Sequence, residues 1–500
     1  MSKTIMDLPQ ELLVSVLQHL TLWERLAGPA LVCRPWHAAC HMPDLISTVC
    51  YAHEFPPSDQ SFQLVKSSLS SLAGWLARHS AAVRALYIAV RCMEPRDIVP
   101  AQGQALLAQL QRCEAACAAA GLCTFSVSCE ANVCMHLHPQ PPNEPGQPES
   151  LAGFLGTSLT SLRQLSVSGR IHGRVDLSVL TALQRLSLRQ AAPSIYPANH
   201  ASLPSCLTAL DIGFADWVTE WPYRGGQRFL SLAATVWQLP RLRSLQLHGR
   251  AGPLRAEWAP MAKLSSTLLR LRVADFEGLP SGLVAALGCL TSLRLLELVD
   301  LRGEGDGNEA GREGDTAGSA GRDLGAALGC LTSLTGLVIH NVIGRQLLYN
   351  LPPFAQLAGL GGLRALHYAV YAGGDAPGGL PHGASQLSMR HLAIEERLLH
   401  ESRPWVEGAA ALERVLIKWY VYPDCRAPGG RNLGAPNWDW LWAWAAAHAP
   451  LRTLCFDLGE EDEPAGLMAV AQRLQACRPG LRVERCRFAM AWKELGADWQ

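Results

Sequence analysis

A short pattern, Leu-x-x-Leu-x-Leu, recurs along most of this chain and constrains its fold more than any other feature. The clear copies begin at Leu162, Leu183, Leu207, Leu242, Leu268, Leu293, Leu334 and Leu363. Weaker copies begin at Met389, Leu412 and Leu451, and an early outlier begins at Val83. The last two apolar positions are two residues apart, which places them on one face of a β-strand. Each copy therefore predicts a short strand with one buried face.

The spacing of the copies indicates a repeat architecture. The central apolar residue advances by 21 residues from Leu165 to Leu186 and by 24 from Leu186 to Leu210. These steps fall within the range of leucine-rich repeats, which the chain resembles from about residue 80 onward. Segments before the strands read as helices, for example residues 282–290. The resemblance implies an α/β solenoid with a parallel sheet on its concave side and helices on its convex side.

Three longer steps predict insertions rather than lost repeats. They run over residues 210–245, 296–337 and 415–454. Residues 302–323, inside the second step, are Gly-rich and contain no large apolar side chain, so they predict a disordered loop. The Pro-rich stretch at 139–148 predicts a stiff extended connector.

The first forty residues carry a different, helical pattern. Pro9 suits the first turn of a helix, and Glu11 complements the positive end of the helix dipole. A wide apolar stripe follows, formed by Leu12, Leu13, Val16, Leu17 and Leu20. Pro35 predicts a helix junction, with a third helix starting at Trp36. Nearly forty residues with this much apolar surface predict a partner or close packing on the rest of the chain.

The Leu8-Pro9 start and the Val32-Cys33-Arg34-Pro35-Trp36 end resemble an F-box, the helical module that docks substrate receptors onto the adaptor of cullin-based ubiquitin ligases. One departure is Gly28-Pro29, which interrupts the middle helix. The resemblance implies that the adaptor-binding residues are Leu8, Pro9, Leu12, Leu13, Val16, Leu17, Leu20, Val32, Cys33 and Trp36. The alternative is a helix that only caps the terminal repeat. Docking predicts exposed leucines, whereas capping predicts buried ones.

Composition narrows the classes of function. The chain has 500 residues, 49% of them hydrophobic, and a formal net charge of +0. Zero net charge argues against nucleic acid or an anionic membrane as the main partner, because both need a basic field. No secretory signal and no apolar run of spanning length is visible, so the 16 cysteines are expected to be reduced. We therefore expect the cytoplasm, the nucleus or both.

No motif for catalysis or for a cofactor is present, which predicts a non-enzyme without cofactors. The nearest approach to a metal site is the group Cys123, Cys129, Cys134, His136 and His138. Its spacing fits no standard zinc site, so we predict no bound metal. Cys113 and Cys117 lie four apart on an Ala-rich helix and are expected in the core.

Two groups of residues are candidates for binding a target protein. The first comprises side chains between the repeat leucines on the concave face: Gln164, Arg185, Ser244, Gln246, Arg270 and Glu297. The second is the tryptophan cluster of the third insertion: Trp438, Trp440, Trp442 and Trp444. A helix over residues 437–449 would place these indoles on two opposite faces. One face is expected on the repeats, and the other is either exposed for a partner or covered by residues 419–422.

These patterns predict the following domains: an F-box-like helical domain at 1–48, irregular N-terminal repeats at 49–138, a Pro-rich linker or loop at 139–150, a leucine-rich-repeat array at 151–488 and a C-terminal tail at 489–500. The expected function is that of a non-catalytic substrate receptor in an SCF-type ubiquitin ligase, with a Skp-type adaptor and an unknown target protein as partners. The rival hypothesis is a leucine-rich-repeat scaffold or sensor without a ligase.

Overall fold

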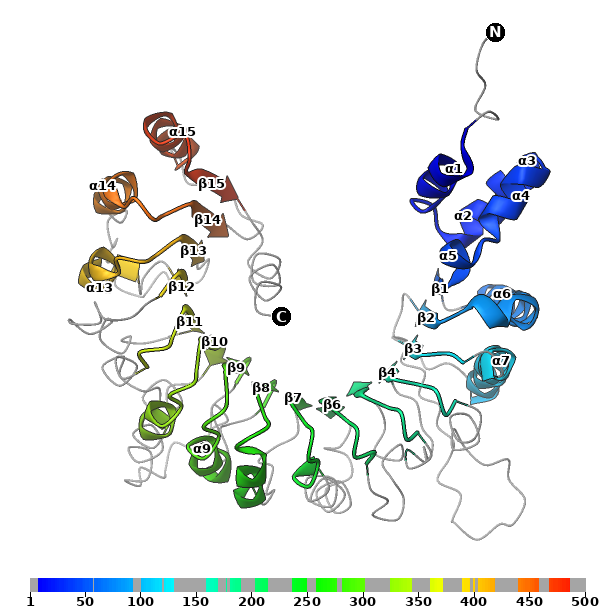
Figure 1. Cartoon of the computed structure of the whole chain (residues 1–500), viewed down its shortest axis with the longest axis horizontal. Helices are drawn as coiled ribbons and strands as arrows, with labels where there is room; N and C mark the ends of the chain where they lie inside the picture. Colours follow the sequence, from blue (N-terminus) through cyan, green and yellow to red (C-terminus); the bar gives the residue numbers. More distant parts are fainter. Residues whose placement is uncertain are drawn as a thin grey trace. The chain divides into compact units, whose positions relative to one another are not determined.

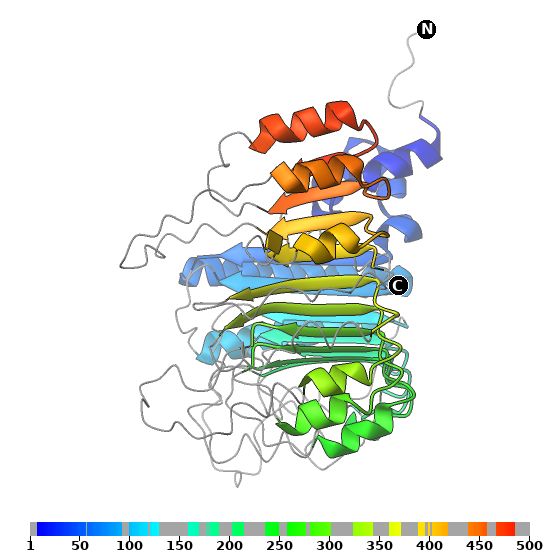
Figure 2. The same cartoon turned by 90° about the vertical axis from the view of Figure 1, so that its left-hand side faces the viewer.

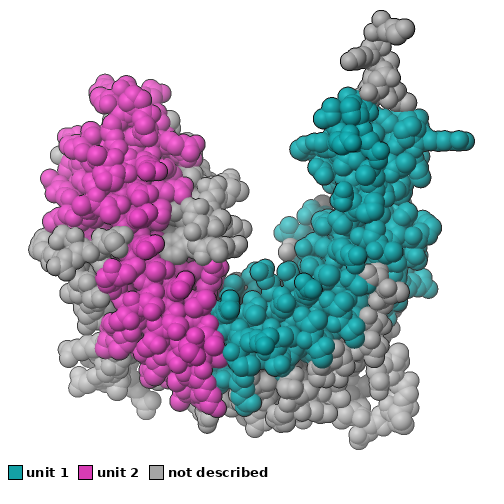
Figure 3. Space-filling model, viewed as in Figure 1, with its two compact units in different colours: residues 1–251 teal, residues 252–500 magenta. Residues whose placement is uncertain are grey.

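The computed structural model covers the whole chain in two compact units, residues 1–251 and 252–500 (Figure 3). The residues described are 8–56, 58–92, 100–118, 121–129, 159–169, 177, 180–189, 203–214, 236–249, 258–276, 281–301, 324–343, 360–371, 389–395, 399–400, 403–418, 439–457 and 467–485. The Pro-rich segment 139–150, the insert 302–323 and the tail 489–500 lie outside them, so the predictions for these segments remain predictions.

Unit 1 begins with short helices: α1 (Gln10–Leu17), α2 (Leu22–Ala27), α3 (Pro29–Val32), α4 (Arg34–Cys40) and α5 (Pro43–Ile46). The Thr21 side chain accepts from the backbone N–H of Glu24, and the Glu24 carboxylate accepts from the N–H of Thr21, so a capping box starts α2. Helix α2 ends before Gly28 and α3 begins at Pro29, which confirms the helix interruption expected at Gly28-Pro29. Five helices thus replace the three that were predicted.

Two predicted helix starts need correction. Pro9 is the N-cap of α1 rather than a residue of its first turn. Helix α4 begins at Arg34, two residues before Trp36, because a proline such as Pro35 is tolerated in the first turn of a helix.

The rest of unit 1 contains the strands β1 (Thr48–Phe55), β2 (Ala85–Cys92), β3 (Thr124–Cys129), β4 (Gln164–Gly169), β5 (Arg185–Arg189), β6 (Ala209–Phe214) and β7 (Ser244–Gly249). Successive strands pair in parallel. Helices α6 (Asp59–His79) and α7 (Pro100–Ala118) connect β1 to β2 and β2 to β3, and they lie side by side on one face of the sheet (Figure 1). Residues 49–138 therefore include regular helix–strand units, although the sequence had indicated irregular repeats.

Unit 2 contains the strands β8 (Arg270–Ala274), β9 (Leu295–Val299), β10 (Gly336–Ile343), β11 (Ala365–Tyr371), β12 (His391–Glu395), β13 (Arg414–Lys418), β14 (Thr453–Asp457) and β15 (Arg482–Arg485). They also pair in parallel and in sequence order. The helical segments include η7 (Ala259–Leu264), α9 (Ser281–Leu287), residues 324–329, α13 (Arg403–Gly408), α14 (Asp439–Ala447) and α15 (Leu467–Cys477). Helices α13, α14 and α15 follow one another beside their strands (yellow to red in Figure 2). Among the described residues, no helix is long and apolar enough to span a membrane.

The register of the strands confirms how the repeats were aligned. Leu165 pairs with Leu186 across adjacent strands, as the pattern requires. The three long steps also end in register: Leu210 opposite Leu245, Leu296 opposite Leu337, and Val415 opposite Leu454. Residues between these strands are therefore insertions and not lost repeats. The paired leucines are buried on the helix side, where they form the core of each unit.

The residue that precedes each strand forms a second regular feature, which we call the edge ladder. At most of these positions the carbonyl oxygen accepts two hydrogen bonds from the next repeat, whereas the Arg452 carbonyl accepts one, from Arg482. For example, the Thr335 carbonyl accepts from the N–H groups of Arg364 at 2.8 Å and Ala365 at 3.1 Å. The ladder fixes the distance between neighbouring repeats at the edge where the strands begin.

Candidate functional site

Helix α1 has two rows of apolar side chains, and the inner row forms the core of the helical domain. Leu13 is 6% exposed and Leu17 is 0% exposed. They pack with Ala30, Ala39, Cys40 and Leu45. Their assignment as surface residues that contact an adaptor is therefore wrong, because they hold the helices of the domain together.

The outer row of α1 is exposed. Leu12 is 54% exposed and Val16 is 51% exposed, and Leu8 precedes the helix at 37%. On α3, Leu31 and Val32 are 76% and 57% exposed. The described residues include seven exposed large hydrophobic side chains, and these five are among them. The helical domain thus concentrates the apolar surface that is typical of an interaction site.

The other predicted contact residues take intermediate positions. Pro9 is exposed, whereas Leu20, Cys33 and Trp36 are half-buried. Leu20 and Trp36 pack against the core of the domain. Leu31 was not predicted, although its place beside Val32, directly after the Gly28 break, is a signal that could have identified it.

The opposite side of the domain is fixed to the first repeat. Within the domain, the Arg25 guanidinium donates a buried hydrogen bond at 2.8 Å to the Leu45 carbonyl of α5, the helix that leads into β1. Trp23 meets Tyr51 of β1 edge to face, with ring centroids 6.3 Å apart. The Ser47 carbonyl accepts from the backbone N–H groups of Arg84 and Ala85, which begins the edge ladder. The domain therefore caps the sheet with one side and exposes apolar residues on another.

Residues 5–52 match the F-box-like family. The chain contains an F-box-like domain. Such a domain indicates an adaptor or receptor role in SCF-type ubiquitin ligases, and F-box proteins are typically non-catalytic. No curated protein matches the chain.

The predicted strand-face residues lie where the pattern placed them. Gln164, Arg185, Ser244 and Gln246 lie on strands of unit 1, whereas Arg270 and Glu297 lie on strands of unit 2. Arg185 is exposed and the others are half-buried. Glu297 pairs with Arg272 at 3.0 Å. The structure places these residues on several strands and does not bring them together as one site.

The tryptophans of α14 are largely used in packing. Trp444 is 8% exposed and stacks on His448 with ring centroids 4.8 Å apart. Trp442 is half-buried, with its ring 5.8 Å from that of Phe456. The prediction that Trp444 binds a target protein is therefore wrong, because its side chain is buried.

Trp440 also has partners within unit 2. Its indole N–H donates to His400 Nδ1 at 3.2 Å, and the Arg403 guanidinium lies 5.4 Å from the ring centroid. Trp438 lies outside the described residues. The described tryptophans thus join α14 to neighbouring elements.

The cysteine predictions have a mixed outcome. Cys113 and Cys117 are fully buried, and burial raises the pKa of each thiol to about 12, which confirms their place in the core. Within the described residues no group of three or more metal-ligating side chains occurs. Because Cys134, His136 and His138 lie outside that part of the chain, the metal prediction stays open.

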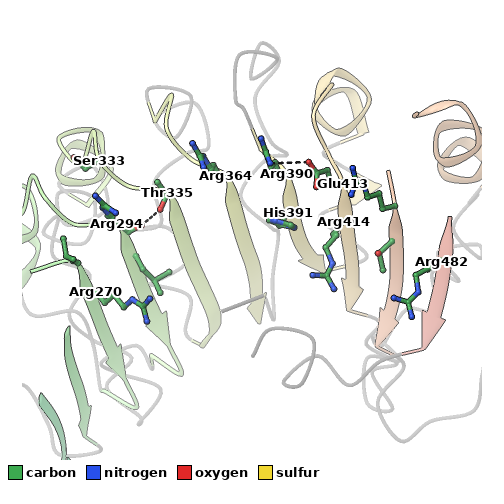
Figure 4. A pocket seen from close by; sticks show the side chains of 14 residues that line it. Arg270, Arg294, Ser333, Thr335, Arg364, Arg390, His391, Glu413, Arg414 and Arg482 are labelled. Carbon is green, nitrogen blue, oxygen red and sulfur yellow. Dashed lines mark hydrogen bonds and ion pairs between the residues drawn. The ribbon is translucent and has the colours of Figure 1, made fainter. Parts of the chain in front are cut away.

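A groove in unit 2, which sequence reasoning missed, lies along the edge where the strands begin (Figure 4). Its volume is about 1110 Å³. Among the described residues, its charged lining consists of one glutamate, Glu413, and the arginines Arg270, Arg294, Arg364, Arg390, Arg414, Arg452 and Arg482. We call it the arginine groove. A signal was present, because an arginine directly follows the first apolar residue of the pattern at Leu293, Leu363, Met389 and Leu451.

Proposed function

We propose that the protein is a non-catalytic substrate receptor of an SCF-type ubiquitin ligase. Its F-box-like domain binds a Skp-type adaptor, and through that adaptor a cullin ligase, while the helix–strand units bind a target protein. The observation that carries this proposal is the exposure of large apolar side chains on both α1 and α3. Burial against an adaptor would remove them from water, which is favourable by about 25 cal/mol for each Å².

We also propose that the helix–strand units are leucine-rich repeats forming a solenoid. The in-register leucines and the parallel strands support this assignment. In such an array the open strand face and the strand edges are available for binding. Transfer of ubiquitin would then be accelerated by proximity, with the chemistry supplied by other subunits. The proposed location is the cytoplasm, the nucleus or both.

Adaptor binding by the full-length chain tests the proposal. The Leu12→Asp/Val16→Asp double variant places two charges on the outer row of α1 and leaves Leu13 and Leu17 in the core. We expect the wild type to retain the adaptor in a pull-down, and this variant to lose it while keeping its thermal melting temperature.

The matched control is Leu64→Asp, because Leu64 is also a large exposed apolar residue, at 60%, but lies on α6 outside the helical domain. This control should bind the adaptor like the wild type. If the wild type does not bind any Skp-type adaptor, the receptor proposal fails.

The second candidate is a repeat scaffold or sensor with no ligase, in which the helical domain serves as a cap. The contacts of Trp23 with Tyr51 and of Ser47 with the next strand favour capping. Capping alone leaves the exposure of Leu12, Val16, Leu31 and Val32 without a role. For that reason we place it second.

A further inference from the structure

The arginine groove is built on the edge ladder, which places its charges in a row. The Arg390 N–H donates to the Arg364 carbonyl at 2.8 Å, the Glu413 N–H to the Arg390 carbonyl at 2.8 Å, and the Arg452 N–H to the Glu413 carbonyl at 2.7 Å. Arg294 occupies the same ladder position before β9. Each of these arginines therefore lies directly before a different strand. Figure 4 shows Arg294, Arg364 and Arg390 at the ends where their strands begin.

The groove arginines differ in whether a neighbouring carboxylate offsets their charge. Arg390 lies 3.6 Å from Glu413, and Arg482 lies 3.0 Å from Glu484. Arg294, Arg364 and Arg452 are exposed. No side-chain ion pair of these three is found with any residue that the structure describes. Arg294, Arg364 and Arg452 therefore produce a positive field along this edge.

We infer that the arginine groove binds an acidic segment of the target protein, an extended stretch rich in aspartate and glutamate. The inference rests on the proposed function, because it names the kind of target surface that the receptor would recognise. Arginine is the side chain best suited to carboxylates, since its planar guanidinium can donate two parallel hydrogen bonds to one carboxylate.

The dimensions of the groove favour an extended peptide over a small anion. From β9 to β14 the ladder makes five strand-to-strand steps, or roughly 24 Å at the usual strand spacing. About seven residues of extended chain cover that length. The volume of about 1110 Å³ also exceeds the range usual for small-molecule pockets.

The distribution of charge favours several carboxylates over a single phosphate. The ladder arginines come from different strands and are spaced along the edge, so they do not converge on one point. The described residues that line the groove include no Trp, Tyr or Phe. Single-stranded nucleic acid usually needs such rings for base stacking, so a protein segment fits better.

Fluorescence anisotropy with the full-length protein tests the inference. The probe is a labelled peptide of about twelve residues that alternates Asp or Glu with Ser, and its neutral counterpart carries Asn and Gln instead. We expect the acidic peptide to bind at least tenfold more tightly than the neutral one. We also expect its affinity to fall as the NaCl concentration rises from about 0.05 to about 0.3 M.

The groove variant is Arg364→Gln/Arg452→Gln, which we expect to bind the acidic peptide about tenfold more weakly. The matched control is Arg163→Gln/Arg243→Gln, because both residues occupy the same exposed ladder position in unit 1 and do not line the groove. The control should change the affinity less than twofold. Thermal melts establish that both variants stay folded.

Several outcomes would overturn the inference. They are equal binding of the neutral peptide, an equal loss in the control pair, and binding of either a singly phosphorylated neutral peptide or an oligo(U) RNA as tightly as the acidic peptide. Adaptor pull-down with the same samples separates the two proposals. Peptide binding without adaptor binding refutes the receptor role and leaves the groove assignment standing, whereas the reverse refutes the groove assignment alone.

Discussion

Acidification should loosen unit 2 through the histidine pair His340 and His367. Their rings lie 5.0 Å apart on the adjacent strands β10 and β11. Burial is the main cause that lowers the pKa of His340 from 6.5 to about 4. The pKa of His367 is lowered well below 6.5 by burial and by His340. Both rings are therefore neutral in the folded protein at pH 5, whereas the same histidines in the unfolded chain are protonated.

The charged groups near His340 act in both directions. Lys418 and Arg272 lower its pKa further, whereas Asp300 and Asp457 raise it. Burial outweighs them. Because the unfolded chain binds the proton and the folded chain does not, the free energy of unfolding falls as the pH drops below 6.5 and continues to fall towards pH 4. Linkage gives a loss of about 2 kcal/mol between pH 7 and pH 5 from His340 alone.

Hydrogen exchange measured by mass spectrometry, corrected for the intrinsic effect of pH, reports this loss strand by strand. Amides of β9, β10 and β11 should show an opening free energy smaller by at least about 2 kcal/mol at pH 5 than at pH 7, because His367 adds to the loss from His340. The His340→Gln variant should show a correspondingly smaller pH effect. Replacement of the exposed His19 by Gln serves as control. Equal protection of these strands at both pH values in the wild type would refute the reasoning.

Three further predictions concern stability and reactivity. Leu17→Ala should destabilise the helical domain by about 3 kcal/mol, while Leu12→Ala changes it by less than about 0.5 kcal/mol in urea unfolding, because only Leu17 is in the core. Arg478→Gln should cost about 2 kcal/mol of local stability. It removes hydrogen bonds to the carbonyls of Ala445, His448, Ala449 and Leu451, and faster exchange of α14 amides would reveal their loss. Cys113 and Cys117, with a pKa of about 12, should react with iodoacetamide far more slowly than exposed thiols at pH 8, as peptide mapping would show.

Each of these three predictions has a clear contradiction. Equal destabilisation by Leu17→Ala and Leu12→Ala would mean that both rows of α1 are equivalent. Unchanged exchange in α14 would show that Arg478 does not hold that helix. Rapid labelling of Cys113 in the folded protein would show that α7 opens readily.

The strands of the repeats were predictable because leucines two residues apart can be buried only when their strands pair in register. Three strands, β1, β3 and β15, were not recognised as copies of the pattern. The inward positions are Val49 and Tyr51 in β1 and Phe125 and Val127 in β3, and β15 has Arg485 opposite Phe456, so the leucine pattern does not detect them. In β1 and β3 burial follows the same two-residue period, but the buried residues are Val, Tyr and Phe in place of Leu.

The helical domain shows a different limit. Helical spacing identifies an apolar stripe, but Leu12 and Val16 form one row along α1 and Leu13 and Leu17 form another, each four residues apart. Periodicity does not determine which row faces inward, because that depends on how α4 packs against α1. The arginine groove was missed for a related reason. Charges at exposed positions leave no apolar signal, and their alignment is visible only once the strand register is known.

The edge ladder also separates what this fold holds constant from what it leaves adjustable. The first apolar residue of each pattern lies two positions before its strand, as in Leu293 and Leu295 or Leu451 and Thr453. All variation in repeat length therefore falls between the end of one strand and the first apolar residue of the next pattern. Doubling a loop there costs only about 0.6 kcal/mol in chain entropy. New segments can thus enter this protein between its strands while the spacing of side chains along the edge ladder stays unchanged.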